Sequence, residues 1–149
     1  MNLIQENTEE VEFHTSLKQV AHWMEINLEN YDWHFADVEG GWPGLNGPVW
    51  VTGEELRLKI KKDDYPFIWA VISAFPKGSD PIVSDEPFAD GNSEFWKGNP
   101  RKQMAGSLFE IVCWDSSATL WIELPKDLGE NVLQNAPGIS TLEEVNGES

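Results

Sequence analysis

Cysteine, basic residues and long apolar runs are scarce in this sequence, and each shortage excludes a class of protein. The single cysteine, Cys113, cannot form a disulfide within the chain, so a reducing, cytoplasmic setting is expected. No apolar run approaches the roughly 18 residues that a membrane helix needs. The first ten residues also lack the basic and apolar segments of a signal peptide. We therefore expect a soluble, cytoplasmic protein that does not enter a membrane.

The shortage of basic residues leaves a large negative charge. Ten Lys and Arg stand against 26 Asp and Glu, and the formal net charge at pH 7 is −16. Such a field repels nucleic-acid phosphates and anionic lipid, and it accelerates the encounter with cationic partners. The sequence thus favours a basic protein as partner over nucleic acid or membrane, and it leaves the oligomeric state open. Acidity that serves only solubility is the plainer alternative.

Bulky aromatic side chains, in contrast, are plentiful. The 149 residues include eight tryptophans and seven phenylalanines, which supply large side chains for a hydrophobic core. The length is that of one domain. We expect a single domain over residues 1–149, with loose ends at 1–13 and 141–149 and one long loop at 76–106.

Two segments have the pattern of a helix. Ser16 and Gln19 are spaced as a capping box, in which the serine side chain accepts a hydrogen bond from a free amide of the first turn. Apolar residues then repeat at helical spacing over 17–28, which predicts a helix with one buried face. A second, shorter apolar face at 128–133 is followed by proline and glycine and predicts a short C-terminal helix.

Other segments have strand patterns. Apolar and charged residues alternate strictly over 55–61, which predicts a strand with one face on the core and one in water. Aromatic and β-branched residues predict further strands at 33–38, 49–52, 67–75, 107–114 and 118–124. The last two flank a short polar turn, as in a hairpin. The predicted fold class is α+β, with a mainly antiparallel β-sheet, one N-terminal helix and one short C-terminal helix.

The long loop predicted at 76–106 is the most informative segment for function. Loops of this length are uncommon in compact domains and are usually functional or disordered. Its first part combines acidic residues with large aromatic ones, which a purely solvating linker would lack. The residues predicted to bind a partner are Asp85, Glu86, Asp90, Glu94, Phe95 and Trp96. In the plainer alternative, the aromatic residues only anchor the loop to the core.

No motif for catalysis, a cofactor or a metal is found. His14 and His22 stand eight residues apart with no cysteine or histidine cluster nearby, so no metal site is predicted. His34 and Asp32 could share a strand face as half of a metal or acid–base site, although an ordinary surface pair is the simpler interpretation. The glycine-rich segment 40–47 lacks both the spacing and the lysine of a phosphate-binding loop, and it predicts a turn. We expect no enzyme activity and no cofactor.

Several strings in the C-terminal half carry a resemblance to known proteins. The strings lie at 88–92, 95–96, 111–120 and 138–146, and they read FADGN, FW, IVCWDSSATL and GISTLEEVN. They resemble a group of small, uncharacterised acidic bacterial proteins, and similar small acidic proteins act as immunity partners of secreted bacterial toxins. The resemblance implies a stoichiometric, toxin-neutralising role, and it transfers no binding residues.

The leading hypothesis is a non-catalytic acidic protein that binds and blocks a cationic protein, such as a toxin nuclease. An enzyme that grips phosphates carries a basic cleft, and an acidic inhibitor can occupy that cleft with fast, electrostatically steered association. Two alternatives stay open. One is a small-ligand-binding domain or unrecognised enzyme with a pocket lined by tryptophans, and the other is a nucleic-acid mimic.

Overall fold

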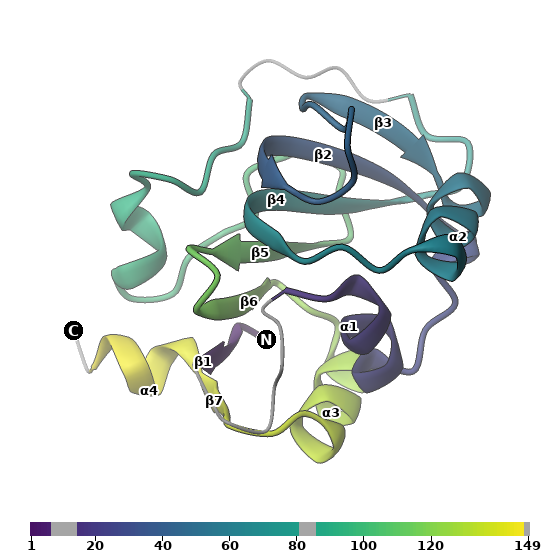
Figure 1. The fold of residues 1–149 in the computed structure, drawn as a ribbon. Helices are drawn as coiled ribbons and strands as arrows, with labels where there is room; N and C mark the ends of the chain where they lie inside the picture. Colours follow the sequence, from purple (N-terminus) through teal and green to yellow (C-terminus); the bar gives the residue numbers. More distant parts are fainter. Residues whose placement is uncertain (7–14, 81–85, 148–149) are drawn as a thin grey trace.

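A seven-stranded antiparallel sheet forms the centre of the structure. The structure is a computed structural model, and it describes residues 1–6, 15–80 and 86–147. In these residues the strand order is β3-β2-β4-β5-β6-β1-β7 (Figure 1). The strands are β1 (Leu3–Glu6), β2 (Tyr31–Gly40), β3 (Val49–Thr52), β4 (Phe67–Pro76), β5 (Phe109–Trp114), β6 (Ala118–Ile122) and β7 (Ile139–Thr141). The helices are α1 (Leu17–Met24), α2 (Gly53–Lys62), α3 (Lys126–Asn135) and α4 (Leu142–Asn146), with 3-10 turns η1 (Leu28–Asn30) and η2 (Ser93–Trp96). The predicted α+β class is confirmed, although the described residues hold four α-helices where the sequence predicted two.

One face of the sheet packs against helices α1, α2 and α3. Its largest side chains are fully buried, namely Trp33, Phe35, Phe67, Phe109 and Trp121. Burial of one phenylalanine side chain contributes about 1.5–3 kcal/mol to stability. This aromatic cluster is therefore the main hydrophobic core, and it accounts for the high aromatic content of the sequence.

The other face of the sheet is covered by irregular chain. Residues 86–106, which we call the long loop, cross this face together with α4 (Figure 1). Phe95 of the loop and Leu142 of α4 are buried in the same cluster as Val71 and Val112 of the central strands. The long loop thus forms one layer of the domain.

Helix α1 begins and ends for local reasons. The hydroxyl of Ser16 accepts a hydrogen bond from the backbone N–H of Gln19 at 3.3 Å, which confirms one half of the predicted capping box. The reciprocal half is not formed, because Oε1 of Gln19 has no hydrogen-bond partner among the described residues. The helix ends at Met24, earlier than predicted, because Glu25 adopts a left-handed conformation with φ of 57°. Leu28, the last residue of the predicted apolar face, is still buried, in η1.

The strand predicted at 55–61 is wrong, because these residues form helix α2. The hydroxyl of Thr52 accepts a hydrogen bond from the backbone N–H of Glu55 at 3.2 Å and caps the helix. Acidic residues stand in the first turn and lysines in the last, which complements the helix dipole. Leu56 is buried while Leu58 is 60% exposed, so the alternating residues do not share one face as they would in a strand.

The two ends of the chain are more ordered than the sequence predicted. Residues Leu3–Glu6 form β1 between β6 and β7, so the prediction of a loose start is wrong for these residues. The rest of the predicted loose start lies outside the described residues. At the other end, α4 follows directly on β7, and the hydroxyl of Thr141 accepts a hydrogen bond from the backbone N–H of Glu144. The predicted loose end is therefore wrong for 141–146.

Other predictions are confirmed with small shifts in their boundaries. Strands β2, β3 and β4 match the predicted segments, and β5 and β6 form the expected hairpin around a three-residue turn. Helix α3 is the predicted C-terminal helix. The glycine-rich segment 40–47 connects β2 to β3, as predicted for a turn.

Candidate partner-binding surface

A carboxylate from β2 fixes the start of the long loop. Asp37 has a left-handed backbone with φ of 52°, at the place where the register between β2 and β4 shifts. Its Oδ2 accepts hydrogen bonds from the backbone N–H groups of Ala89 and Asp90, both at 2.9 Å. Hydrogen bonds to a charged acceptor are stronger than neutral ones. This contact positions the loop next to the edge of the buried cluster.

Two asparagines fix the middle of the long loop. The side-chain amide of Asn146 in α4 donates hydrogen bonds to the carbonyl oxygens of Phe95 at 3.0 Å and Gly98 at 3.1 Å. The side-chain amide of Asn2 donates to the carbonyl of Pro100 at 2.8 Å. The backbone of an irregular segment must find partners of this kind where water is excluded, and here both ends of the chain supply them.

A buried carboxylate fixes the end of the long loop. Glu110 on β5 is fully buried and accepts hydrogen bonds from the backbone N–H of Gln103 at 2.8 Å and of Met104 at 3.0 Å. The hydroxyl of Ser73 on β4 donates a third hydrogen bond at 3.0 Å. Burial raises the pKa of Glu110, and these three hydrogen bonds oppose that effect only in part.

Three half-buried tryptophans lie at the margin of this face, and we call Trp69, Trp96 and Trp114 the tryptophan cluster. Trp114 is central: its ring centroid lies 4.8 Å from that of Trp69 on β4 and 4.9 Å from that of Trp96 in η2. Both contacts are edge-to-face, which is a favoured aromatic geometry. The cluster therefore joins two strands and the long loop in one rigid aromatic surface.

The structure brings together part of the site predicted from the sequence. The predicted residues that are exposed are Glu86, Asp90 and Glu94, and Trp96 is half-buried in the tryptophan cluster. Phe95 is only 1% exposed, so its prediction as a contact residue is corrected: it anchors the loop to the core. Asp85 lies outside the described residues. The plainer alternative, in which loop aromatics serve as anchors, therefore holds for Phe95 but not in full for Trp96.

Sequence reasoning missed two of the three tryptophans in the cluster. Trp69 and Trp114 lie in apolar strands and look like ordinary core residues in the sequence. They share a face only because β4 pairs with β5, and that pairing is not visible in the chain itself. The one local signal is that Trp114 comes last in its strand, directly before the polar hairpin turn.

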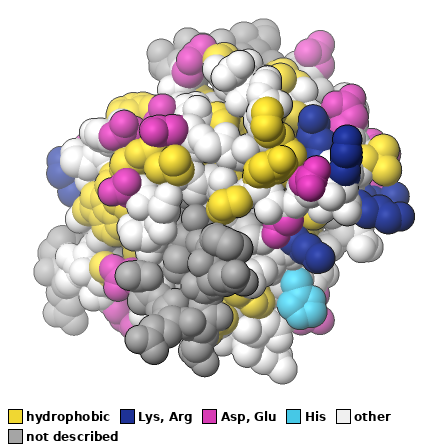
Figure 2. Space-filling view, viewed as in Figure 1, with side chains coloured by type: hydrophobic (Ala, Val, Ile, Leu, Met, Phe, Trp, Pro, Cys, Tyr) yellow, Lys and Arg dark blue, Asp and Glu magenta, His cyan; other side chains and the backbone are white. Residues whose placement is uncertain are grey.

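Two exposed acidic residues are neighbours of the tryptophan cluster, one in the strand register and one along the chain. Glu39 is exposed and stands directly opposite Trp69 in the register of β2 and β4. Asp115 is exposed and follows Trp114 at the start of the hairpin turn. In Figure 2, hydrophobic and acidic side chains gather over the long loop and this hairpin, while Lys and Arg gather over α2. On the face shown, the larger group of basic side chains therefore lies over α2.

His34 and Asp32 do not form the pair that the sequence suggested. His34 is 2% exposed, and its Nδ1 has no hydrogen-bond partner among the described residues. Burial lowers its pKa. The carboxylate of Asp32 instead accepts a hydrogen bond from Lys77 at 2.7 Å. His34 stands opposite Ser73 in the sheet register, but the hydroxyl of Ser73 donates its hydrogen bond to Glu110 and not to His34.

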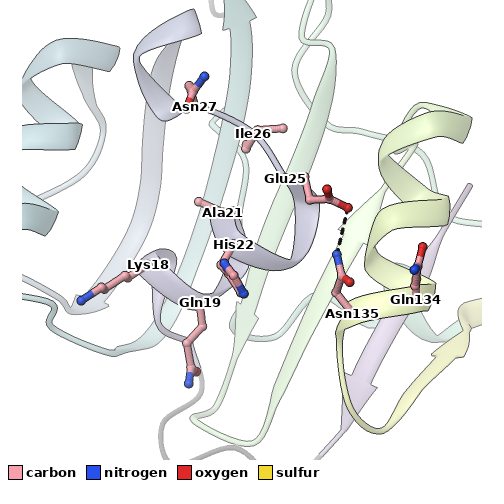
Figure 3. A pocket seen from close by; sticks show the side chains of 9 residues that line it. All are labelled: Lys18, Gln19, Ala21, His22, Glu25, Ile26, Asn27, Gln134 and Asn135. Carbon is pink, nitrogen blue, oxygen red and sulfur yellow. Dashed lines mark hydrogen bonds between the residues drawn. The ribbon is translucent and has the colours of Figure 1, made fainter.

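Three hollows on the described surface bear on the alternative of a tryptophan-lined ligand pocket. The largest of the three, about 840 Å³, lies between α1 and the end of α3, and most of the residues that line it are of polar or charged type (Figure 3). There Asn135 donates a hydrogen bond to Glu25 at 3.1 Å, while Lys18 and Gln19 point away from this pair. The other two, about 380 and 420 Å³, lie beside α2 and under the long loop. None of the three has a tryptophan in its lining.

The placement of the described side chains gives little support for a metal site or a reactive thiol. Across residues 1–6, 15–80 and 86–147, no three His, Cys, Asp or Glu side chains are placed to hold a metal ion. Cys113 is buried in β5, and burial raises the pKa of its thiol to about 12. In the same described part of the chain, no helix is long and apolar enough to cross a membrane.

Comparison with protein-family models, with curated proteins and with solved structures finds no match to this chain. The geometry and charge of the surface formed by the long loop and the tryptophan cluster are therefore the main evidence for function.

Proposed function

We propose that this chain is a non-catalytic acidic binding protein of the cytoplasm that neutralises a cationic protein, such as a toxin nuclease. One observation carries the proposal. Side chains from across the fold hold the long loop in place, so that exposed carboxylates lie beside a half-buried tryptophan cluster in a chain of net charge −16.

The two components of this surface have different physical roles. Exposed ion pairs contribute only about 0–1 kcal/mol each, so the carboxylates would mainly speed the encounter with a basic partner. Large aromatic side chains that lose water on binding supply most of the affinity in protein interfaces, and tryptophan is among the most enriched of them. A rigid loop also loses little conformational entropy on binding. This combination suits a tight, stoichiometric inhibitor.

The choice of partner follows from charge. A nuclease that grips phosphates needs a basic cleft, and an acidic surface of fixed shape can occupy it. The segments 88–92 and 111–120 resemble small acidic bacterial proteins, and similar small acidic proteins act as immunity partners of toxins, which agrees with this choice. A cytoplasmic location suits Cys113, a lone buried thiol.

The test is complex formation with the product of the neighbouring gene in the source genome. Co-expressed and purified, the two proteins are expected to form a one-to-one complex whose association rate falls with salt, and a nuclease partner should lose activity at equimolar inhibitor. Binding to several unrelated DNA-binding proteins would instead indicate a nucleic-acid mimic. If no basic protein binds, the proposal is wrong.

A further inference from the structure

Building on the proposed function, we propose that the tryptophan cluster is the centre of the contact and that it receives an arginine side chain of the cationic partner. The guanidinium would lie against an indole of the cluster and pair with the carboxylates of Glu39 and Asp115. This places the contact beside the β5–β6 hairpin, whereas the sequence alone placed it along the acidic part of the loop.

The burial of the tryptophans supports this placement. Trp33 and Trp121 on the helical side of the sheet are fully buried, as core residues should be. Trp69, Trp96 and Trp114 pack on one another and yet remain partly open to water. Half-exposed indoles held in place by edge-to-face neighbours need no rearrangement to receive a ligand. A cation over an indole face gains about 0.5–2 kcal/mol, with tryptophan the best of the aromatic side chains.

The neighbouring charges define the ligand further. Among the described residues, neither Glu39 nor Asp115 forms an ion pair. Both are exposed, and each stands next to a tryptophan of the cluster, Glu39 across the strand pair and Asp115 along the chain. A planar guanidinium can stack on an aromatic ring while its N–H groups bind a carboxylate in bidentate fashion, whereas an ammonium group lacks this geometry. Arginine is therefore favoured over lysine.

Trp50 provides an internal control on the same face of the sheet. It lies on the edge strand β3, is 40% exposed, and contacts His34 with ring centroids 5.0 Å apart. However, Asp32 on the neighbouring strand β2 is already paired with Lys77, with 2.7 Å between the two charged groups. Trp50 thus has the exposure of a binding residue, but Asp32 on the neighbouring strand is already neutralised. Glu86 acts electrostatically on His34, which Trp50 contacts.

The first experiment uses the free protein and a short probe. The indole N–H signals of ¹⁵N-tryptophan-labelled protein are followed by NMR during titration with a capped peptide of alternating arginine and glycine, and with its lysine counterpart. The signals of Trp69, Trp96 and Trp114 should shift with the arginine peptide, and clearly less with the lysine peptide. Equal or larger shifts of Trp50, or identical patterns with both peptides, would overturn the inference.

The second experiment separates this inference from the proposed function. In complex with the neighbouring-gene partner, Trp96→Ala should raise the dissociation rate roughly 30-fold, the effect of a hot-spot residue. The double variant Glu39→Gln, Asp115→Asn keeps shape and should also weaken binding, while Trp50→Ala should not. Circular dichroism confirms that each variant is folded. If the native protein binds the partner but these variants dissociate at the same rate as the native protein, only the proposed location is wrong. If the arginine peptide shifts the NMR signals of the tryptophan cluster but no basic protein binds, only the proposed function is wrong.

Discussion

Replacing Glu110 by glutamine should weaken the fold by an amount that depends on pH. The carboxylate receives three hydrogen bonds, two at Oε2 from Ser73 and Met104 and one at Oε1 from Gln103. A glutamine can place its oxygen at Oε2 and keep two of them. Its NH₂ group then faces the N–H of Gln103, a donor facing a donor. Losing one hydrogen bond costs about 1–3 kcal/mol when the remaining group is buried.

The pH dependence follows from the direction of the pKa shift. Burial raises the pKa of Glu110 above its ordinary value of 4.5, so the folded state holds this proton more tightly than the unfolded state. The resulting stabilisation is complete below the unfolded pKa and is lost as pH rises through the folded pKa. Glutamine does not titrate. The stability advantage of the native protein over Glu110→Gln should therefore shrink as pH rises, by about 1.4 kcal/mol for each unit of upward shift.

The assay is urea unfolding followed by tryptophan fluorescence, repeated from about pH 4.5 to about pH 7.5. Carboxylates with lowered pKa, such as Asp32 beside Lys77, change stability in the opposite direction, but they are common to both proteins and cancel in the difference. Glu94→Gln, at an exposed glutamate, is the matched control and should change stability by less than about 0.5 kcal/mol. A gap that widens with rising pH would show that the hydrogen bonds outweigh burial and would refute the reasoning.

Three further outcomes are expected. Leu56→Ala should lower the free energy of unfolding by about 2–5 kcal/mol and Leu58→Ala by less than about 0.5 kcal/mol, as measured by urea unfolding, because α2 buries only the first of the two. Similar losses for both would mean that 55–61 is a strand after all. Thr52→Ala should cost about 1 kcal/mol through the lost cap of α2, and an unchanged midpoint would argue against that cap. Asp37→Ala should speed hydrogen exchange at the amide of Ala89 more than Asp37→Asn does, since only asparagine keeps an acceptor there; equal protection in both variants would contradict the role of Asp37.

Much of the fold could be predicted from local patterns because local physics determines it. The cap at Ser16 and the apolar run of β4 each specify their element within a dozen residues. The strand prediction for 55–61 was wrong because Leu56 and Ile60 are four residues apart, a spacing that fits one helix face as well as one strand face. The capping hydroxyl of Thr52, just before the segment, favoured the helix. Strand β1 has only four residues, too few for any period to be recognised.

The candidate site was predictable only in part. The acidic and aromatic composition of the long loop pointed to the side of the molecule on which the proposed surface lies, but it could not separate buried Phe95 from half-buried Trp96. Trp69 and Trp114 meet through strand pairing between distant parts of the chain. Glu110 was the overlooked signal, since an acidic residue within an apolar strand implies several hydrogen-bond donors nearby.

The position of β1 in the sheet has a consequence for how the protein is made. Leu3 pairs with Trp121 on one side and with Thr141 on the other, across more than a hundred residues of chain. During synthesis, β1 therefore cannot form its hydrogen bonds in the sheet until β6 has left the ribosome. Contacts of such long sequence separation slow folding. Among the described strands β7 pairs only with β1, so this edge of the sheet cannot form before β1 is in place.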